Sequence, residues 1–102
     1  MTTYLEKYVN WAYLGKGFRI GTPKGYIYLI VKEVSGTRGN RHGKIEIHGS
    51  SLIQEGSLVE LTKQKPVKLA DDISAKVSNS PTSGSRLSIG IVRPYYYPIK
   101  LI

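Results

Sequence analysis

The feature that most constrains this chain is a series of short apolar runs that begins at Phe18 and continues to the C-terminus. Apolar and polar residues alternate within the runs, and Gly, Pro, Ser and Asn separate them. A period of two is typical of strands that bury one face, and frequent turn residues favour antiparallel connections. We therefore expect a mostly β protein whose small antiparallel sheet is curled into a barrel or sandwich.

Individual strands can be placed from this pattern. Residues 26–34 are aromatic and β-branched throughout, so this segment is predicted to be the central strand. Residues 44–48 alternate and indicate the return strand of a hairpin. Further strands are expected at residues 18–20, 57–63, 73–77 and 86–92. A polar loop is expected at residues 78–85, and it is too short for a domain linker.

The N-terminal segment follows a different pattern. Thr3 and Glu6 have the spacing of a helical capping box. Apolar residues then recur at helical spacing, at Tyr4, Leu5, Tyr8, Val9 and Ala12. The sequence therefore predicts one helix at residues 3–14, packed on a β-rich region at residues 18–102. Trp11 is expected in the core or as a lid over it, with base stacking as the alternative.

Length and residue usage favour one domain over residues 1–102. The absence of cysteine excludes disulfides, thiolate zinc sites and cysteine nucleophiles. The longest apolar run, residues 26–31, is far shorter than the roughly 20 residues of a spanning helix. The first residues lack the features of a secretory signal, so a cytoplasmic location without membrane association is expected.

The net charge is strongly positive. Fifteen Lys and Arg residues against seven Asp and Glu give a formal charge of +8 and a pI of about 9.8. Such an excess attracts polyanions, nucleic acid above all. The alternatives are that the charge serves solubility or attracts an acidic protein partner.

Candidate nucleic-acid-binding residues fall in three regions. The glycine-rich segment at residues 35–44 would let a phosphate approach the backbone closely, although a flexible hairpin tip would have the same composition. In the run at residues 95–97, strand alternation would place the first and third tyrosines on one face, and at least one of the three in the core. The candidates are Arg38, Arg41, His42, Lys44, Lys63, Lys65, Arg86, Arg93, Tyr95, Tyr97 and Lys100.

Catalytic motifs are not recognisable. Glu46 and His48 would project from the same face of one strand, but no nucleophile or third metal ligand is identifiable near them, so we expect an ordinary solvated strand face. In the basic segment at residues 39–44 the leading glycine of a phosphate-binding loop is misplaced, and Ile45 stands where that loop has Ser or Thr. We expect no enzyme activity, no cofactor and no metal.

Residues 61–100 resemble the carbon storage regulator family of RNA-binding proteins. The matching segments are Leu61-Thr62-Lys63, Asp71-Asp72-Ile73, Leu87-Ser88-Ile89-Gly90-Ile91 and Pro94. A similar strand order occurs earlier, at residues 17–21, 28–34 and 44–47. The resemblance implies a small all-β protein that binds GGA-containing messenger RNA leaders and controls translation. It also implies that one chain would carry two sheet halves that the family builds from two chains. The family's terminal His-Arg corresponds here to Lys100-Leu101.

The sequence therefore favours a small basic protein that binds nucleic acid, RNA over DNA, and regulates by occupying its target. Phosphate contacts by Lys and Arg would supply affinity, and stacking on exposed tyrosines would favour single strands. The alternative is a protein-interaction module or inhibitor, since the C-terminal Leu101 and Ile102 would need an apolar cover. A homodimer through sheet edges is compatible with either function.

Overall fold

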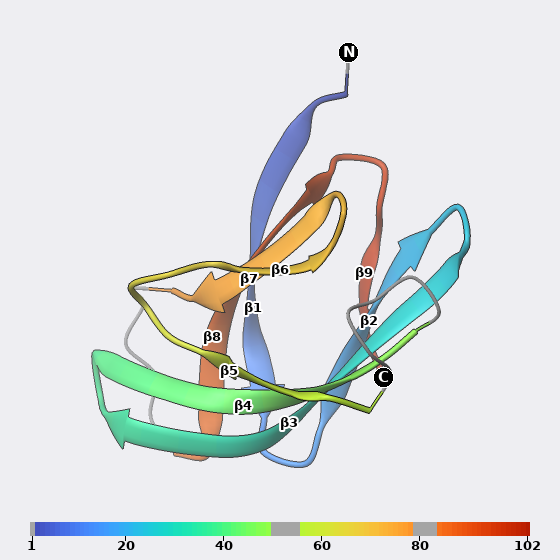
Figure 1. The fold of residues 1–102 in the computed structure, drawn as a ribbon. Coiled ribbons are helices and arrows are strands. Elements are labelled where there is room, and N and C mark those ends of the chain that lie inside the picture. Colours follow the sequence, from blue (N-terminus) through green and yellow to red (C-terminus); the bar gives the residue numbers. More distant parts are fainter. Residues whose placement is uncertain (1, 50–55, 79–83) are drawn as a thin grey trace.

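The fold is taken from a computed structural model, which describes residues 2–49, 56–78 and 84–102. Within these ranges the chain forms strands and no helix, so the mostly β prediction is confirmed. In chain order the strands are β1 (Tyr4–Tyr13), β2 (Gly17–Thr22), β3 (Gly25–Thr37), β4 (Asn40–His48), β5 (Leu58–Leu61), β6 (Val67–Ala70), β7 (Ile73–Val77), β8 (Arg86–Pro94) and β9 (Ile99–Leu101) (Figure 1).

The strands form two antiparallel sheets (Figure 1). One sheet has the order β1-β8-β7-β6, and the other has the order β5-β4-β3-β2-β9. The described strands do not close into a barrel, so the barrel alternative of the fold prediction is wrong. Each sheet instead ends in edge strands, which are β1 and β6 in the first sheet and β5 and β9 in the second.

The predicted N-terminal helix at residues 3–14 is also wrong, because this segment is the edge strand β1. It pairs with β8, and the register shifts between Val9 and Ala12, which lie opposite Ile89 and Leu87. The extra residue of this β-bulge turns both Val9 and Ala12 toward the core although they are three positions apart. A spacing of three also occurs on one face of a helix, so Val9 and Ala12 contributed to the incorrect prediction. Tyr4, Leu5 and Tyr8, which completed the helical pattern, are about half exposed.

The two sheets repeat one arrangement. β2-β3-β4 and β6-β7-β8 are antiparallel meanders. In each sheet, the last strand of the meander pairs with a further strand, and this further strand is the one that precedes the other meander in the sequence. Thus β1 pairs with β8, and β5 pairs with β4. Equivalent hydrogen bonds follow the two exchanged strands: the Val31 amide donates to Lys16 O at 2.9 Å, and the Val77 amide donates to Thr62 O at 3.0 Å. Neither sheet is therefore built from one half of the chain.

The core lies between the sheets, where the inward-facing residues of nearly every strand meet. Leu87 of β8 packs directly on Gly43 of β4, since its Cδ1 lies 2.8 Å from the position that a Cβ on Gly43 would take. The most buried apolar side chains are Val9, Phe18, Ile20, Leu29, Val31, Ile45, Ile47, Leu61, Leu69, Ile73, Leu87, Ile89 and Ile91. Trp11 packs against this core while remaining partly exposed. Nothing in the described part of the chain is a helix long and apolar enough to cross a membrane.

Several predicted boundaries change. The glycine-rich loop expected at residues 35–44 is mostly strand, because β3 continues to Thr37 and β4 begins at Asn40, leaving a tight turn at Arg38 and Gly39. Strands β6 and β9 lie outside every segment that the alternation predicts as strand. Most of the loop expected at residues 78–85 lies outside the described residues.

Candidate nucleic-acid interface

The turn between β3 and β4 gathers several of the predicted cationic residues. β5 pairs with β4 so that Leu61 lies opposite Gly43, which carries the chain after β5 toward the turn. Lys63 Nζ there donates a hydrogen bond to Gly39 O at 2.5 Å. Residues far apart in sequence thus meet at one end of the molecule (Figure 1). We call the set Arg38, Arg41, His42 and Lys63 the basic hairpin end.

No ion pair joins the basic hairpin end to an acid among the described residues. Arg38 and His42 are exposed, and Arg41 and Lys63 are half-buried. Lys44 differs from them, because its Nζ lies 3.6 Å from the Glu33 carboxylate and its register partner on β5 is Glu60. The turn therefore carries three cationic side chains, those of Arg38, Arg41 and Lys63, that form no ion pair among the described residues.

Lys65 and Arg86 are separate from this contact. Lys65 is exposed in the connection between β5 and β6. Arg86, the first residue of β8, lies with its guanidinium carbon 5.7 Å from the centre of the Tyr13 ring and donates to the Tyr13 hydroxyl at 3.3 Å. Its guanidinium therefore packs on an aromatic ring.

Two predicted contact residues, Arg93 and Tyr97, lie inside the protein with 7% and 6% exposure. Arg93 Nε donates to Tyr97 O at 3.1 Å, and its Nη1 donates to Leu5 O at 3.2 Å. Burial lowers the pKa of the Arg93 guanidinium. These contacts tie the segment after β8 to β1, so both side chains act in the scaffold rather than on an exposed surface.

The tyrosine run is a turn rather than a strand at Tyr95 and Tyr96, which are 60% and 54% exposed. Neighbouring rings in the run meet edge to face, at 5.4 Å between Tyr95 and Tyr96 and 5.1 Å between Tyr96 and Tyr97. Strand alternation therefore does not apply, and Tyr96 is on the surface while Tyr97 is in the core. Lys100, on β9, is exposed as well.

Sequence reasoning missed a second surface on the outer side of the five-stranded sheet. Arg19 pairs with Lys100 on one side and Tyr28 on the other, and its guanidinium carbon lies 4.3 Å from the centre of the Tyr26 ring. The rings of Tyr26 and Tyr28 are 6.3 Å apart. We call Arg19, Tyr26, Tyr28 and Lys100 the tyrosine–arginine face. The alternation of Tyr26 and Tyr28 with buried Ile27 and Leu29 is the signal that locates it.

Glu46 and His48 do share one strand face, as expected. His48 Nε2 lies 2.6 Å from Glu46 Oε1, and this hydrogen bond holds the pKa of Glu46 below its ordinary value. Lys32 Nζ is 3.9 Å from the same oxygen. The described residues contain no group of three or more potential metal ligands, and Glu46 is the shared partner of His48 and Lys32 on the sheet surface.

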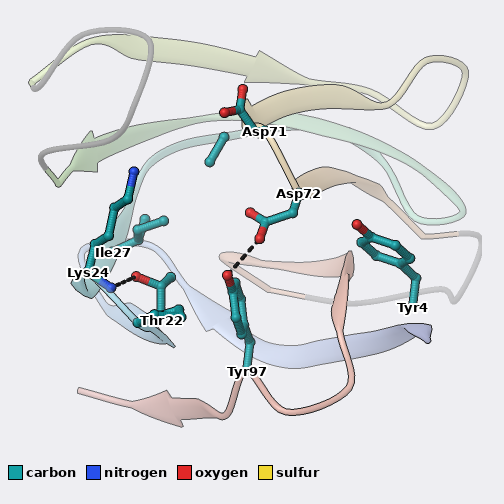
Figure 2. Close-up of a pocket in the computed structure, with 9 residues that line it drawn as sticks. Tyr4, Thr22, Lys24, Ile27, Asp71, Asp72 and Tyr97 are labelled. Carbon is teal, nitrogen blue, oxygen red and sulfur yellow. Dashed lines mark hydrogen bonds between the residues drawn. The ribbon is translucent and has the colours of Figure 1, made fainter. Parts of the chain in front are cut away.

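A pocket of about 310 Å³ opens at the other end of β3, between the β2–β3 and β6–β7 turns (Figure 2). Figure 2 shows Lys24 and Tyr4 on either side of Asp72 and Tyr97. The Tyr97 hydroxyl donates to Asp72 Oδ2 at 2.6 Å, and this bond, with burial, raises the pKa of Tyr97 to about 12. Asp71 also lines the pocket. The pocket thus carries two carboxylates, while Lys24 lines it as well and Lys68 Nζ lies 3.9 Å from Asp71 Oδ1.

Comparison with known proteins identifies no relative, since no protein-family model, curated protein or solved structure matches this chain.

Proposed function

We propose that this chain is a non-catalytic RNA-binding regulator that acts by occupying its target. The observation that carries the proposal is the bond between Lys63 and Gly39, which adds a distant cation to the turn that already carries Arg38, Arg41 and His42. Arg38, Arg41 and Lys63 form no ion pair with an acid among the described residues. Cations placed close together in this way can neutralise neighbouring phosphates, which is the main source of affinity for nucleic acid.

Two further features support the same proposal. His42 and Lys44 project on the same outer side of the five-stranded sheet as Tyr28, since alternate residues of β4 share a face and His48 lies opposite Tyr28. A strand that contacts the hairpin end can therefore continue toward exposed aromatic rings. The exchange of β1 and β5 between the meanders is the arrangement expected if one chain carries two halves that the carbon storage regulator family builds from two chains.

The test is a salt titration of RNA binding, measured by fluorescence anisotropy with a labelled single-stranded RNA. We expect affinity to fall steeply between roughly 50 and 200 mM salt. In the double variant Arg38→Ala with Lys63→Ala, the slope of log K against log salt should be shallower by about 0.7 for each phosphate that the variant no longer neutralises. DNA of the same sequence tests the expected preference for RNA.

The matched control is Lys7→Ala with Lys24→Ala, which removes the same charge at exposed positions outside the hairpin end. This control should bind with nearly the parental slope. If both double variants change the slope equally, binding reflects net charge alone, and the basic hairpin end is not the site.

One observation favours the alternative of a protein-interaction module. Leu101 and Ile102 are 57% and 61% exposed, and Leu5 on the edge strand β1 is 48% exposed. Apolar side chains left open in this way are typical of a surface that another protein covers. A protein complex would persist through the same salt range and survive nuclease treatment, whereas an RNA complex would not.

A further inference from the structure

A groove of about 530 Å³ adjoins the tyrosine–arginine face. Its aromatic walls are Tyr26 from β3 and Tyr96 from the turn after β8, and both rings are about half exposed, at 49% and 54%. Pro23 and Pro98 also line it, and Gly21 keeps it open, since a Cβ there would lie 3.1 Å from Pro98 Cγ. The groove is thus lined by two phenol rings and apolar surface, against which a planar ligand could pack.

Cations lie directly beside this groove. Arg19 is held 4.3 Å from the centre of the Tyr26 ring, and Lys100 lies opposite Arg19 in the pairing of β2 with β9. The Gly21 amide donates to Pro98 O at 2.9 Å, which fixes the Tyr96–Pro98 segment against β2. Stacking surfaces with adjacent cations suit unpaired nucleotides, whose bases stack on aromatic rings while their phosphates meet Arg and Lys.

We propose that the Tyr26–Tyr96 groove binds an unpaired nucleobase of the RNA, with the flanking phosphates on Arg19 and Lys100. The inference rests on the proposed function and adds a substrate class to it, single-stranded rather than double-stranded RNA. A paired base is stacked inside its helix and cannot enter the groove. This site is distinct from the basic hairpin end, because β3 extends over 13 residues between the two.

The carboxylates nearby set the orientation of the nucleotide. Tyr97 lines both this groove and the pocket that contains Asp71 and Asp72 (Figure 2). Lys24 and Lys68 lie beside these carboxylates, whereas Arg19 and Lys100 form no ion pair with an acid among the described residues, so phosphate is attracted more strongly to Arg19 and Lys100. The backbone of the bound strand therefore lies toward Arg19, and the base points into the groove.

The experiment compares three labelled probes by fluorescence anisotropy: a short single-stranded oligouridylate, the same strand with abasic positions, and a blunt RNA duplex. The parental protein should bind the intact strand about tenfold more tightly than the abasic strand, a difference within the range measured for one stacked base. Tyr96→Ala should abolish this difference while leaving the binding of the abasic strand unchanged. Tyr96→Phe should keep it, because stacking needs the ring and not the hydroxyl.

Tyr8→Ala is the matched control, since Tyr8 is 48% exposed on the other sheet, and it should behave as the parental protein. Far-ultraviolet circular dichroism verifies that each variant is folded. If intact and abasic strands bind equally and both depend on Arg38 and Lys63, the groove proposal is overturned while the proposed function stands. If no probe binds even at low salt, both are overturned.

Discussion

At the scale of single residues, the hydrogen bond between Tyr97 and Asp72 makes the stability of the fold depend on pH. Its hydroxyl donates to Asp72, its ring is 6% exposed, and its pKa is raised to about 12. An unfolded tyrosine titrates near pH 10. Because folding favours the neutral phenol, this contribution to stability is complete below about pH 10 and is lost as the pH rises toward 12.

The variant Tyr97→Phe tests this coupling. At pH 8 it should unfold more easily, by about 1 kcal/mol, because one buried hydrogen bond to a carboxylate is removed. Its deficit should shrink between roughly pH 10 and 12, where the parental phenol ionises and loses the same bond. Urea denaturation followed by circular dichroism at pH 8 and again between roughly pH 10 and 12 measures the difference in unfolding free energy. Tyr95→Phe, at an exposed position, serves as control, and a deficit that stays constant with pH would contradict the prediction.

At the scale of strands, the contact between β4 and β8 depends on Gly43. A Cβ at this position would collide with the Glu33 carbonyl oxygen of the paired strand and with Leu87 Cδ1 of the opposite sheet. Neither atom can move away easily, because the Glu33 carbonyl is part of the sheet backbone and the Leu87 side chain is packed in the core. Gly90 differs, because a Cβ there would meet the side chains of Glu6 and Tyr8 on the outer surface, and these can rotate away.

We therefore expect Gly43→Ala to destabilise the protein by about 1–3 kcal/mol, since overpacking forces the backbone or core to shift. Gly90→Ala is the paired control and should cost clearly less. Thermal or urea denaturation of the two variants decides between them. Equal losses would show that the close approach of the sheets at Gly43 has no special cost.

At the scale of the whole molecule, the exchange of β1 and β5 makes each sheet depend on both halves of the chain. β1 finds its partner in β8, while β5 and β9 complete the sheet of β2, β3 and β4. Splitting the chain between the meanders therefore leaves each half with strands whose partners are absent. Unpaired strand edges and a core open on one side do not support a stable fold.

We expect a fragment of residues 1–56 to be unfolded by circular dichroism, and the full chain to unfold in one transition. In the full chain, Trp11 fluorescence, which reports on β1, should change together with the far-ultraviolet signal of all strands. A folded fragment, or two separate transitions, would show that the halves are independent despite their exchanged strands.

The sequence by itself determined the β character, the positions of β2, β3, β4, β5, β7 and β8, and the cationic excess, because alternation and charge are local properties of the chain. It also contained the alternation with Ile27 and Leu29 that places Tyr26 and Tyr28 on the outer face of β3. Tertiary structure alone decided that residues 3–14 form a bulged strand, that Lys63 reaches the hairpin turn, and that Tyr97 and Arg93 are buried while Tyr96 is exposed. These outcomes depend on pairing between distant strands and on turn geometry, which no local period encodes.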